Sequence, residues 1–155
     1  AQFIDFPRVS INLSGAEIST GLAERINKQL SVYDLSASAI MLEITEAQSV
    51  KFSEEVTSAL DPLRQQGFRI SLDDFGTGYS SMSYLSSLKF DEIKVDRSFI
   101  TKMTSDRKTL LLVRAIVSMA QALESKIVAE GVETTEELHC LKDMGIDVVV
   151  GIPGF

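Results

Sequence analysis

Carboxylates and one amide recur where the short apolar runs of this sequence end. These positions are Asn12, Glu43, the pair Asp73 and Asp74, Asp96 and Glu130. Several carboxylates brought to one place repel one another and resist ionisation unless a cation lies among them. An all-oxygen set with one amide suits Mg²⁺, Mn²⁺ or Ca²⁺. The pattern therefore predicts a site for a hard divalent cation, because helix capping would explain one or two such acids but not five strand ends.

Lys94 is a second candidate for chemistry. It lies between Ile93 and Val95, so on a strand it would face away from both of them. We expect Lys94 to point toward the acids, because an unpaired ammonium beneath covering helices would be costly. Asp96 shares its phase and could pair with it. The alternative is a surface lysine whose stem lies along apolar neighbours.

The segment from Asp74 to Ser81 is rich in glycine and hydroxyl groups. Two glycines and three serine or threonine hydroxyls near an expected helix start suit phosphate contact or movement. The spacing matches neither a Walker A loop nor a dinucleotide-binding fingerprint. A simple turn is therefore the alternative for this segment.

The elements that must position these groups follow from hydrophobic periodicity. Segments of helical period contain Leu22 to Leu30, Phe52 to Leu63, and Leu110 to Leu123, and a capping box of Thr134 and Glu137 opens another. Strands that alternate with helices must lie parallel, which predicts an α/β fold. An open doubly wound sheet and a closed TIM-barrel-like (β/α)₈ fold both fit, and acids converging on one mouth favour the barrel. The six expected strands are Arg8–Leu13, Ile40–Ile44, Arg69–Leu72, Glu92–Val95, Lys126–Ala129 and Asp147–Val150.

Composition limits the possible partners. Fifteen Lys and Arg against 22 Asp and Glu give a net charge of −7 over 155 residues, which argues against general binding to DNA, RNA or anionic membranes. An anionic substrate would therefore need metal cations. The single cysteine, Cys140, excludes an internal disulfide, and with His139 as the only histidine it also excludes a Cys and His zinc site. No membrane segment or signal peptide is expected, which favours the cytoplasm.

At these residues the sequence resembles the EAL domain family, bacterial phosphodiesterases that linearise cyclic di-GMP. The motifs occur in the family's order over nearly the whole chain, which we expect to form a single partial EAL domain over residues 1–155. They are Ile11-Asn12-Leu13-Ser14, Leu42-Glu43-Ile44-Thr45-Glu46, Leu72-Asp73-Asp74-Phe75-Gly76-Thr77-Gly78-Tyr79-Ser80-Ser81, Ile93-Lys94-Val95-Asp96-Arg97-Ser98-Phe99 and Ala129-Glu130-Gly131-Val132-Glu133-Thr134.

The resemblance implies roles for individual residues in a metal-dependent hydrolysis of cyclic di-GMP to linear pGpG. Lys94 would orient the attacking water and act with Asp73 and Glu130 in catalysis. Mg²⁺ or Mn²⁺ would serve as cofactor, and Ca²⁺ would bind without supporting turnover. The implied metal ligands are Asn12, Glu43, Asp73, Asp74 and Glu130. The implied supporting acids are Glu46, which anchors the Gly-rich loop, Glu133 and Asp96, and the implied substrate-binding residues are Phe75, Gly76, Thr77 and Gly78.

Two departures from the family pattern weaken the expectation of activity. The Glu-Ala-Leu motif, whose glutamate is a metal ligand in the family, is absent, and Glu46-Ala47-Gln48 is only an echo of it. Val150 precedes Gly151 where the family usually has a glutamine. We therefore expect very slow or absent hydrolysis. A degenerate cyclic di-GMP-binding or interaction module is the alternative, and an enolase-like barrel is a third reading that the Asp73-Asp74 pair suits less well.

The number of strands also predicts self-association. Six of eight barrel strands leave two open edges and a partly uncovered apolar interior. We therefore expect a homodimer or higher oligomer that uses one or both terminal segments. The apolar residues expected in that interface are Phe3, Ile4, Phe6, Val148, Val149, Val150, Ile152 and Phe155.

Overall fold

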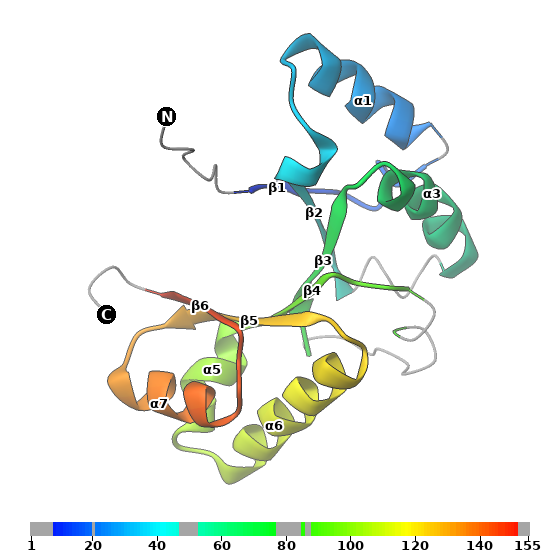
Figure 1. Ribbon diagram of the computed structural model, residues 1–155. Helices are drawn as coiled ribbons and strands as arrows, with labels where there is room; N and C mark the ends of the chain where they lie inside the picture. Colours follow the sequence, from blue (N-terminus) through cyan, green and yellow to red (C-terminus); the bar gives the residue numbers. More distant parts are fainter. Residues whose placement is uncertain (1–7, 20, 47–52, 77–84, 86–87, 152–155) are drawn as a thin grey trace, which may run out of the picture.

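A computed structural model describes residues 8–19, 21–46, 53–76, 85 and 88–151 (Figure 1). The chain alternates strands with helices through most of this length. The strands are β1 (Val9–Asn12), β2 (Ile40–Thr45), β3 (Arg69–Phe75), β4 (Glu92–Val95), β5 (Lys126–Val132) and β6 (Val148–Gly151). The helices are α1 (Leu22–Val32), the short 3₁₀ helix η1 (Ala37–Ala39), α3 (Ser53–Gln65), α5 (Arg97–Met103), α6 (Arg107–Ala122) and α7 (Thr135–Asp143).

All six strands are parallel, and each pairs with the next one along the chain. A doubly wound sheet would reverse its strand order part of the way across, whereas a barrel adds strands in one direction. The unbroken order from β1 to β6 is therefore that of a half-barrel of the TIM type. The predicted α/β class and barrel-like winding are confirmed. Figure 1 shows the edge strands β1 and β6 on the same side of the molecule.

The two faces of the sheet differ sharply in polarity. One face packs against the helices and contributes fully buried side chains to the core, while the other carries Glu43, Ser71, Asp73, Lys94 and Glu130. This division follows from the two-residue period of each strand, because successive side chains point to opposite faces of the sheet. The buried members are Leu42, Ile44, Ile70, Leu72, Ile93, Val95, Ile127 and Ala129.

The helices cover the apolar face as their periodicity requires. Val56, Leu60 and Leu63 on α3 are buried, as are Val113 and Val117 on α6. Figure 1 shows α1 and α3 beside the first half of the sheet and α5, α6 and α7 beside the second half. No helix in the described ranges is both long enough and apolar enough to cross a membrane.

One expectation about the elements was wrong, and one helix was missed. Strands β3 and β5 continue to Phe75 and Val132, so Asp73, Asp74 and Glu130 lie within strands rather than at their ends. The helix α5 was not predicted, because its seven residues are too few to show a clear period. Its signal was Asp96, whose side chain accepts a hydrogen bond from the Ser98 backbone N–H as the N-cap.

Candidate functional site

Lys94 lies at the centre of three carboxylates contributed by three other strands. Its Nζ atom is 2.7 Å from Glu130 Oε1 on β5, 3.2 Å from Glu43 Oε1 on β2 and 3.5 Å from Asp73 Oδ1 on β3. The side chains of Lys94, Glu43 and Asp73 are only 12%, 9% and 17% exposed. We call Lys94, Glu43, Asp73 and Glu130 the acidic centre.

The sheet itself positions the acidic centre. Glu43 pairs in register with Ser71, and Asp73 pairs with Thr45, so the carboxylates of β2 and β3 share one face. Lys94 pairs with Val128, which is two residues before Glu130 on the same face of β5. Because the strands are parallel, all four side chains lie at the carboxyl-terminal end of the sheet. This is the end at which barrel enzymes carry their sites.

The electrostatics of Lys94 favour its charged form. Burial by itself would lower the pKa of Lys94, but the hydrogen bond to Glu130 and the negative charges of Asp73, Glu130 and Glu43 outweigh it. The resulting pKa lies well above the usual value for a lysine. Lys94 is therefore a hydrogen-bond donor and a fixed positive charge near neutral pH, and not a proton acceptor.

A bulge in β3 brings the second aspartate of the pair toward this end. Leu72 pairs with Ile93 and Phe75 with Val95, so three steps of β3 lie opposite two steps of β4. The extra residue is accommodated by a positive φ of 54° at Asp74, whose backbone N–H donates to Asp73 Oδ1 at 2.9 Å. In a regular strand without this bulge, the neighbouring side chains of Asp73 and Asp74 would point to opposite faces of the sheet.

The pKa of Asp74 indicates an excess of negative charge at the carboxyl-terminal end of the sheet. Its pKa is raised, first by partial burial and then by the charges of Asp73, Asp96 and Glu130, while Lys94 opposes the shift only in part. A single ammonium cannot balance this many carboxylates. The carboxyl-terminal end of the sheet therefore favours the binding of a further cation.

The structure puts the remaining implied ligand and the loop anchor near the acidic centre. Asn12 is exposed on the edge strand β1 and pairs in register with Glu43. Glu46 is buried, and its Oε2 accepts a hydrogen bond from the backbone N–H of Gly76 at 2.8 Å. Gly76 has a φ of +101°, and an added Cβ would lie 2.8 Å from the Phe99 ring, so glycine is required where the loop begins.

Three further implied residues have defined contacts in the structure. Phe75 packs in the hydrophobic core and is 7% exposed. Asp96 caps α5, and among the described residues it forms no ion pair with Lys94. Glu133 instead forms an ion pair with Arg97 at the start of α5. Thr77 and Gly78 lie outside the described residues.

Sequence reasoning missed a polar pair beneath the acidic centre. Ser71 Oγ donates to Glu92 Oε1 at 3.3 Å, and Ser71 is fully buried. Burial raises the pKa of Glu92, although its hydrogen bond to Ser71 and the charge of Lys94 oppose that effect. The signal was available, because Glu92 is two residues before Lys94 and therefore shares its face.

The donor chemistry of the acidic centre fits a hard divalent metal. Carboxylate oxygens from Glu43, Asp73, Asp74 and Glu130, with the Asn12 amide beside them, are the groups that Mg²⁺ and Mn²⁺ prefer. In the part of the chain that the structure describes, no three acidic, His or Cys side chains are arranged around one ion position. The carboxylates are gathered around the Lys94 ammonium instead. A bound cation would therefore compete with Lys94 for them.

Comparisons with known proteins agree with the fold and the motifs. The family model for the EAL domain matches residues 1–152. The cyclic di-GMP phosphodiesterase NbdA of Pseudomonas aeruginosa is 37% identical over 145 residues, which are 93% of this chain and 18% of NbdA. The chain thus spans about a fifth of the length of the curated relatives it matches.

Solved structures give the same result. The phosphodiesterase PaMucR in complex with c-di-GMP is 36% identical, with a TM-score of 0.88 over 93% of this chain and 59% of that one. Klebsiella pneumoniae BlrP1 in a manganese and cyclic di-GMP complex is 29% identical, with a TM-score of 0.85 over 93% of this chain and 37% of that one.

Proposed function

We propose that this chain, which belongs to the EAL domain family, carries the central part of a site for metal-dependent hydrolysis of cyclic di-GMP to linear pGpG. The observation that carries the proposal is the acidic centre, in which one lysine and three carboxylates from four strands meet at the carboxyl-terminal end of a half-barrel. The relatives named as cyclic di-GMP phosphodiesterases support the same substrate.

The residues that would hold Mg²⁺ or Mn²⁺ are Asn12, Glu43, Asp73, Asp74 and Glu130. When bound, such cations polarise the phosphodiester and lower the pKa of a bound water. Ca²⁺ would bind the same oxygens without supporting turnover. The structures of BlrP1 with manganese and with calcium support both metals as ligands of this fold.

The chain's own residues would position the water and the substrate. Lys94 keeps its proton, so its N–H groups can hold a water oxygen in place while Glu130, at 2.7 Å, fixes the ammonium. Glu46 holds the Gly76 backbone and with it the start of the Gly-rich loop. Because the chain is strongly acidic, an anionic dinucleotide would approach this end only together with cations.

We further propose that turnover by this chain is impaired. The sequence contains no Glu-Ala-Leu motif, so one carboxylate of the family's metal set has no counterpart in it. Val150 is the register partner of Glu130 on β6 and is 49% exposed, so an apolar side chain stands beside the acidic centre. These two features favour a second candidate function, cyclic di-GMP binding or protein interaction without catalysis.

The test is hydrolysis and binding of cyclic di-GMP by the 155-residue chain with Mn²⁺. We expect binding that requires the metal and turnover well below about 1 per second. Glu43→Gln should abolish both, whereas Glu136→Gln, an exposed control on α7, should change neither. Faster turnover would contradict the impairment. Absence of both binding and hydrolysis would contradict the function itself.

Self-association through the strand edges is part of this proposal. Val9 and Ile11 on β1 are 57% and 38% exposed, and Val148 and Val150 on β6 are 41% and 49% exposed. Strand edges that have no partner among the described residues, and that carry exposed apolar side chains, favour pairing with another copy. The other apolar terminal residues named above, Phe3, Ile4, Phe6, Ile152 and Phe155, lie outside the described residues.

Light scattering coupled to size exclusion measures this association. We expect a mass at least twice 17.0 kDa at micromolar concentration, and a monomer would contradict the proposal. We also propose a cytoplasmic setting, supported by a sequence with one cysteine and therefore no internal disulfide.

A further inference from the structure

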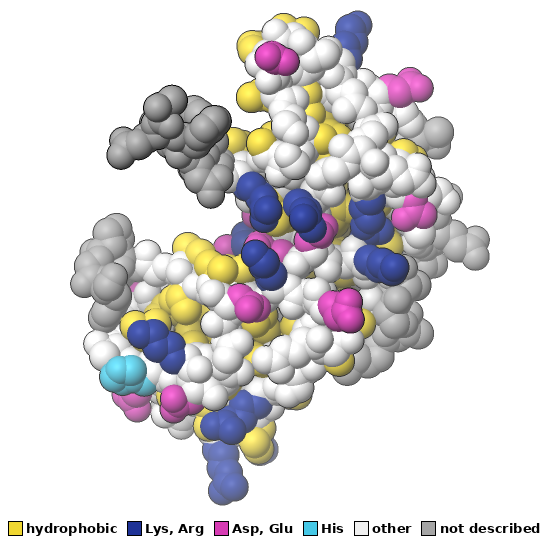
Figure 2. Space-filling model, viewed as in Figure 1, with side chains coloured by type: hydrophobic (Ala, Val, Ile, Leu, Met, Phe, Trp, Pro, Cys, Tyr) yellow, Lys and Arg dark blue, Asp and Glu magenta, His cyan; other side chains and the backbone are white. Residues whose placement is uncertain are grey.

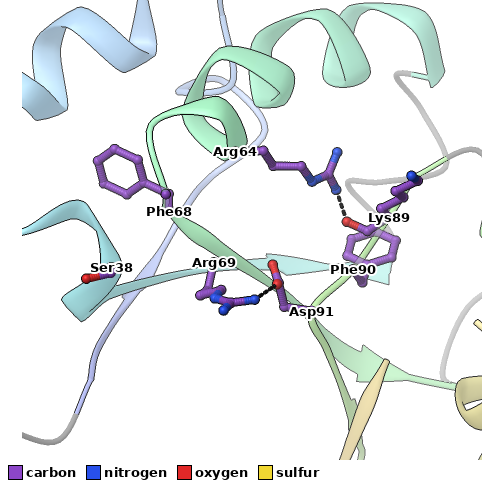
Figure 3. A pocket seen from close by; sticks show the side chains of 8 residues that line it. Ser38, Arg64, Phe68, Arg69, Lys89, Phe90 and Asp91 are labelled. Atoms are coloured by element: carbon purple, nitrogen blue, oxygen red, sulfur yellow. Dashed lines mark hydrogen bonds and ion pairs between the residues drawn. The ribbon is translucent and has the colours of Figure 1, made fainter. Parts of the chain in front are cut away.

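A pocket of about 500 Å³ lies at the opposite end of the sheet from the acidic centre. Its walls come from the end of α3, the first residue of β3 and the segment before β4, which contribute Arg64, Arg69 and Lys89 to Asp91. Figure 3 shows Arg64 and Arg69 on two sides of it. This volume is within the range of small-molecule sites. Nothing in the proposed function uses this pocket.

The pocket is cationic although the chain is acidic. Arg64, Arg69 and Lys89 face a single lining carboxylate, Asp91, in a chain of net charge −7. Asp91 is already engaged, because its Oδ1 is 2.5 Å from Arg69 Nη1 and its Oδ2 accepts from the Ile70 backbone N–H at 2.9 Å. Figure 2 shows Lys and Arg side chains gathered over the middle of the face in view. The excess positive charge is therefore local.

Arg64 is the most constrained of these cations. Its side chain is 19% exposed, and its Nη2 donates to the Lys89 backbone carbonyl, which fixes the guanidinium toward β4. Among the described residues, its one ion pair, from Nη1 to the exposed carboxylate of Asp61, is long at 3.4 Å. Its Nε–H is buried without an acceptor among the described residues. The positive charge is thus held in place but weakly compensated.

The surroundings strengthen any interaction with an anion. Phe68 and Phe90 are 2% and 5% exposed and form apolar walls that reduce solvent screening. A Cβ added at Gly67 would meet no atom within 4 Å other than those of its chain neighbours, so the backbone there is open. For Lys89, no carboxylate of the described residues lies within ion-pair distance of the ammonium. Its charge is therefore available to a ligand.

We propose that this pocket binds a small phosphate-bearing anion. Cations that approach from α3, β3 and the segment before β4 suit a compact tetrahedral group with oxygens in several directions. Arginine forks match phosphate oxygens in pairs, and lysine adds a point charge. A planar carboxylate would present oxygens to fewer of these cations. The site is independent of the acidic centre, which has the opposite charge excess and lies at the other end of the strands.

The experiment is a titration of the ¹⁵N-labelled 155-residue chain with inorganic phosphate, in buffer without added divalent metal. We expect saturable shifts at the amides of Gly67, Phe68 and Asp91, and little change at Gly76. Malonate at equal ionic strength is a matched planar dianion and should bind at least about threefold more weakly. Lys89→Gln should weaken phosphate binding about fivefold, and Arg64→Gln about tenfold or more.

The matched control is Arg114→Gln, an exposed cation on α6 outside the pocket, which should change the phosphate affinity less than about twofold. Lys89 is exposed, so its variant tests the site even if Arg64→Gln does not fold. The absence of saturable shifts, or an equal loss in the control variant, would overturn the site. Equal affinity for malonate would overturn the assignment to phosphate.

Discussion

The two ends of the half-barrel carry opposite charge imbalances on the same strands. At the carboxyl-terminal end, Asp73 of β3 and two further carboxylates surround one ammonium, that of Lys94. At the amino-terminal end of β3, Arg69 and two further cations surround one carboxylate, Asp91. The comparison shows that the contribution of a charged side chain to stability depends on the balance of charges around it. A lysine compensates charge at one end and adds to an excess at the other.

The largest expected difference is between two lysine substitutions. Lys94→Met removes the cation that three mostly buried carboxylates share, so we expect a loss of about 3–5 kcal/mol in the free energy of unfolding without metal. Lys89→Met removes an exposed cation from an excess of cations, so we expect a change within about 0.5 kcal/mol. Urea unfolding at neutral pH measures both. Equal losses would contradict the comparison.

The pH dependence of this loss follows from the raised pKa of Lys94. A lysine whose pKa is higher in the folded state stabilises fully below its ordinary value of 10.5 and less as the pH rises toward the folded value. The wild-type advantage over Lys94→Met should therefore persist to about pH 9 and shrink only at more alkaline pH. A loss of the advantage between pH 7 and 8 would contradict the ion-pair explanation.

Metal addition should stabilise the acidic end. A ligand that binds only the folded state contributes about 2.7 kcal/mol at a hundredfold excess over its Kd, so Mg²⁺ or Mn²⁺ should raise the melting temperature. Asp73→Asn keeps the acceptor for the Asp74 backbone N–H but removes a charge, and it should lose most of this response. Asp143→Asn, exposed at the end of α7, should retain it. An unchanged response in Asp73→Asn would remove Asp73 from the metal site.

Two glycines give a matched comparison of backbone constraint. Gly76 at the acidic end and Gly67 at the basic pocket have φ values of +101° and +97°. Alanine at either should cost about 1 kcal/mol through the left-handed backbone. Gly76→Ala should cost about 1–2 kcal/mol more, because its Cβ would lie 2.8 Å from Phe99. Chemical unfolding measures the difference, and equal costs would show that the Phe99 ring yields freely.

The smallest expected effect is that of Asp74→Asn, whose effect on stability should be opposite in sign to that of Asp91→Asn. The raised pKa of Asp74 means that its charge is unfavourable in the folded chain. This penalty is absent at low pH and appears as the pH rises above the ordinary aspartate value. Asp74→Asn should therefore stabilise the metal-free chain at pH 7 by less than about 1 kcal/mol, given its exposure, and have no effect at pH 3. Thermal melts at both pH values measure it.

Asp91→Asn is the counterpart at the basic end. It removes the charge that pairs with Arg69 at 2.5 Å, so we expect it to destabilise the chain at pH 7. Stabilisation by both substitutions would mean that net charge, rather than the local balance at each end, governs stability.

Much of the fold was predictable because it depends on local pattern. The short apolar runs around Leu42 and Ile93 form buried strands, and the capping box of Thr134 and Glu137 is formed as the spacing predicts. The basic pocket was not predictable. Arg64, Arg69 and Lys89 are spread over 26 positions of the sequence, and no spacing rule brings a helix end and two strand starts together.

The sequence by itself determined the α/β class, the family and the residue types of the acidic centre, because periodicity and motif order are properties of the chain. Only the tertiary structure decided how those acids are used. The bulge at Asp74 and the capping role of Asp96 depend on pairing with a neighbouring strand or on the start of a short helix. The convergence of Glu43, Asp73 and Glu130 on Lys94 depends on the register of four strands, which residue spacing along the chain does not encode.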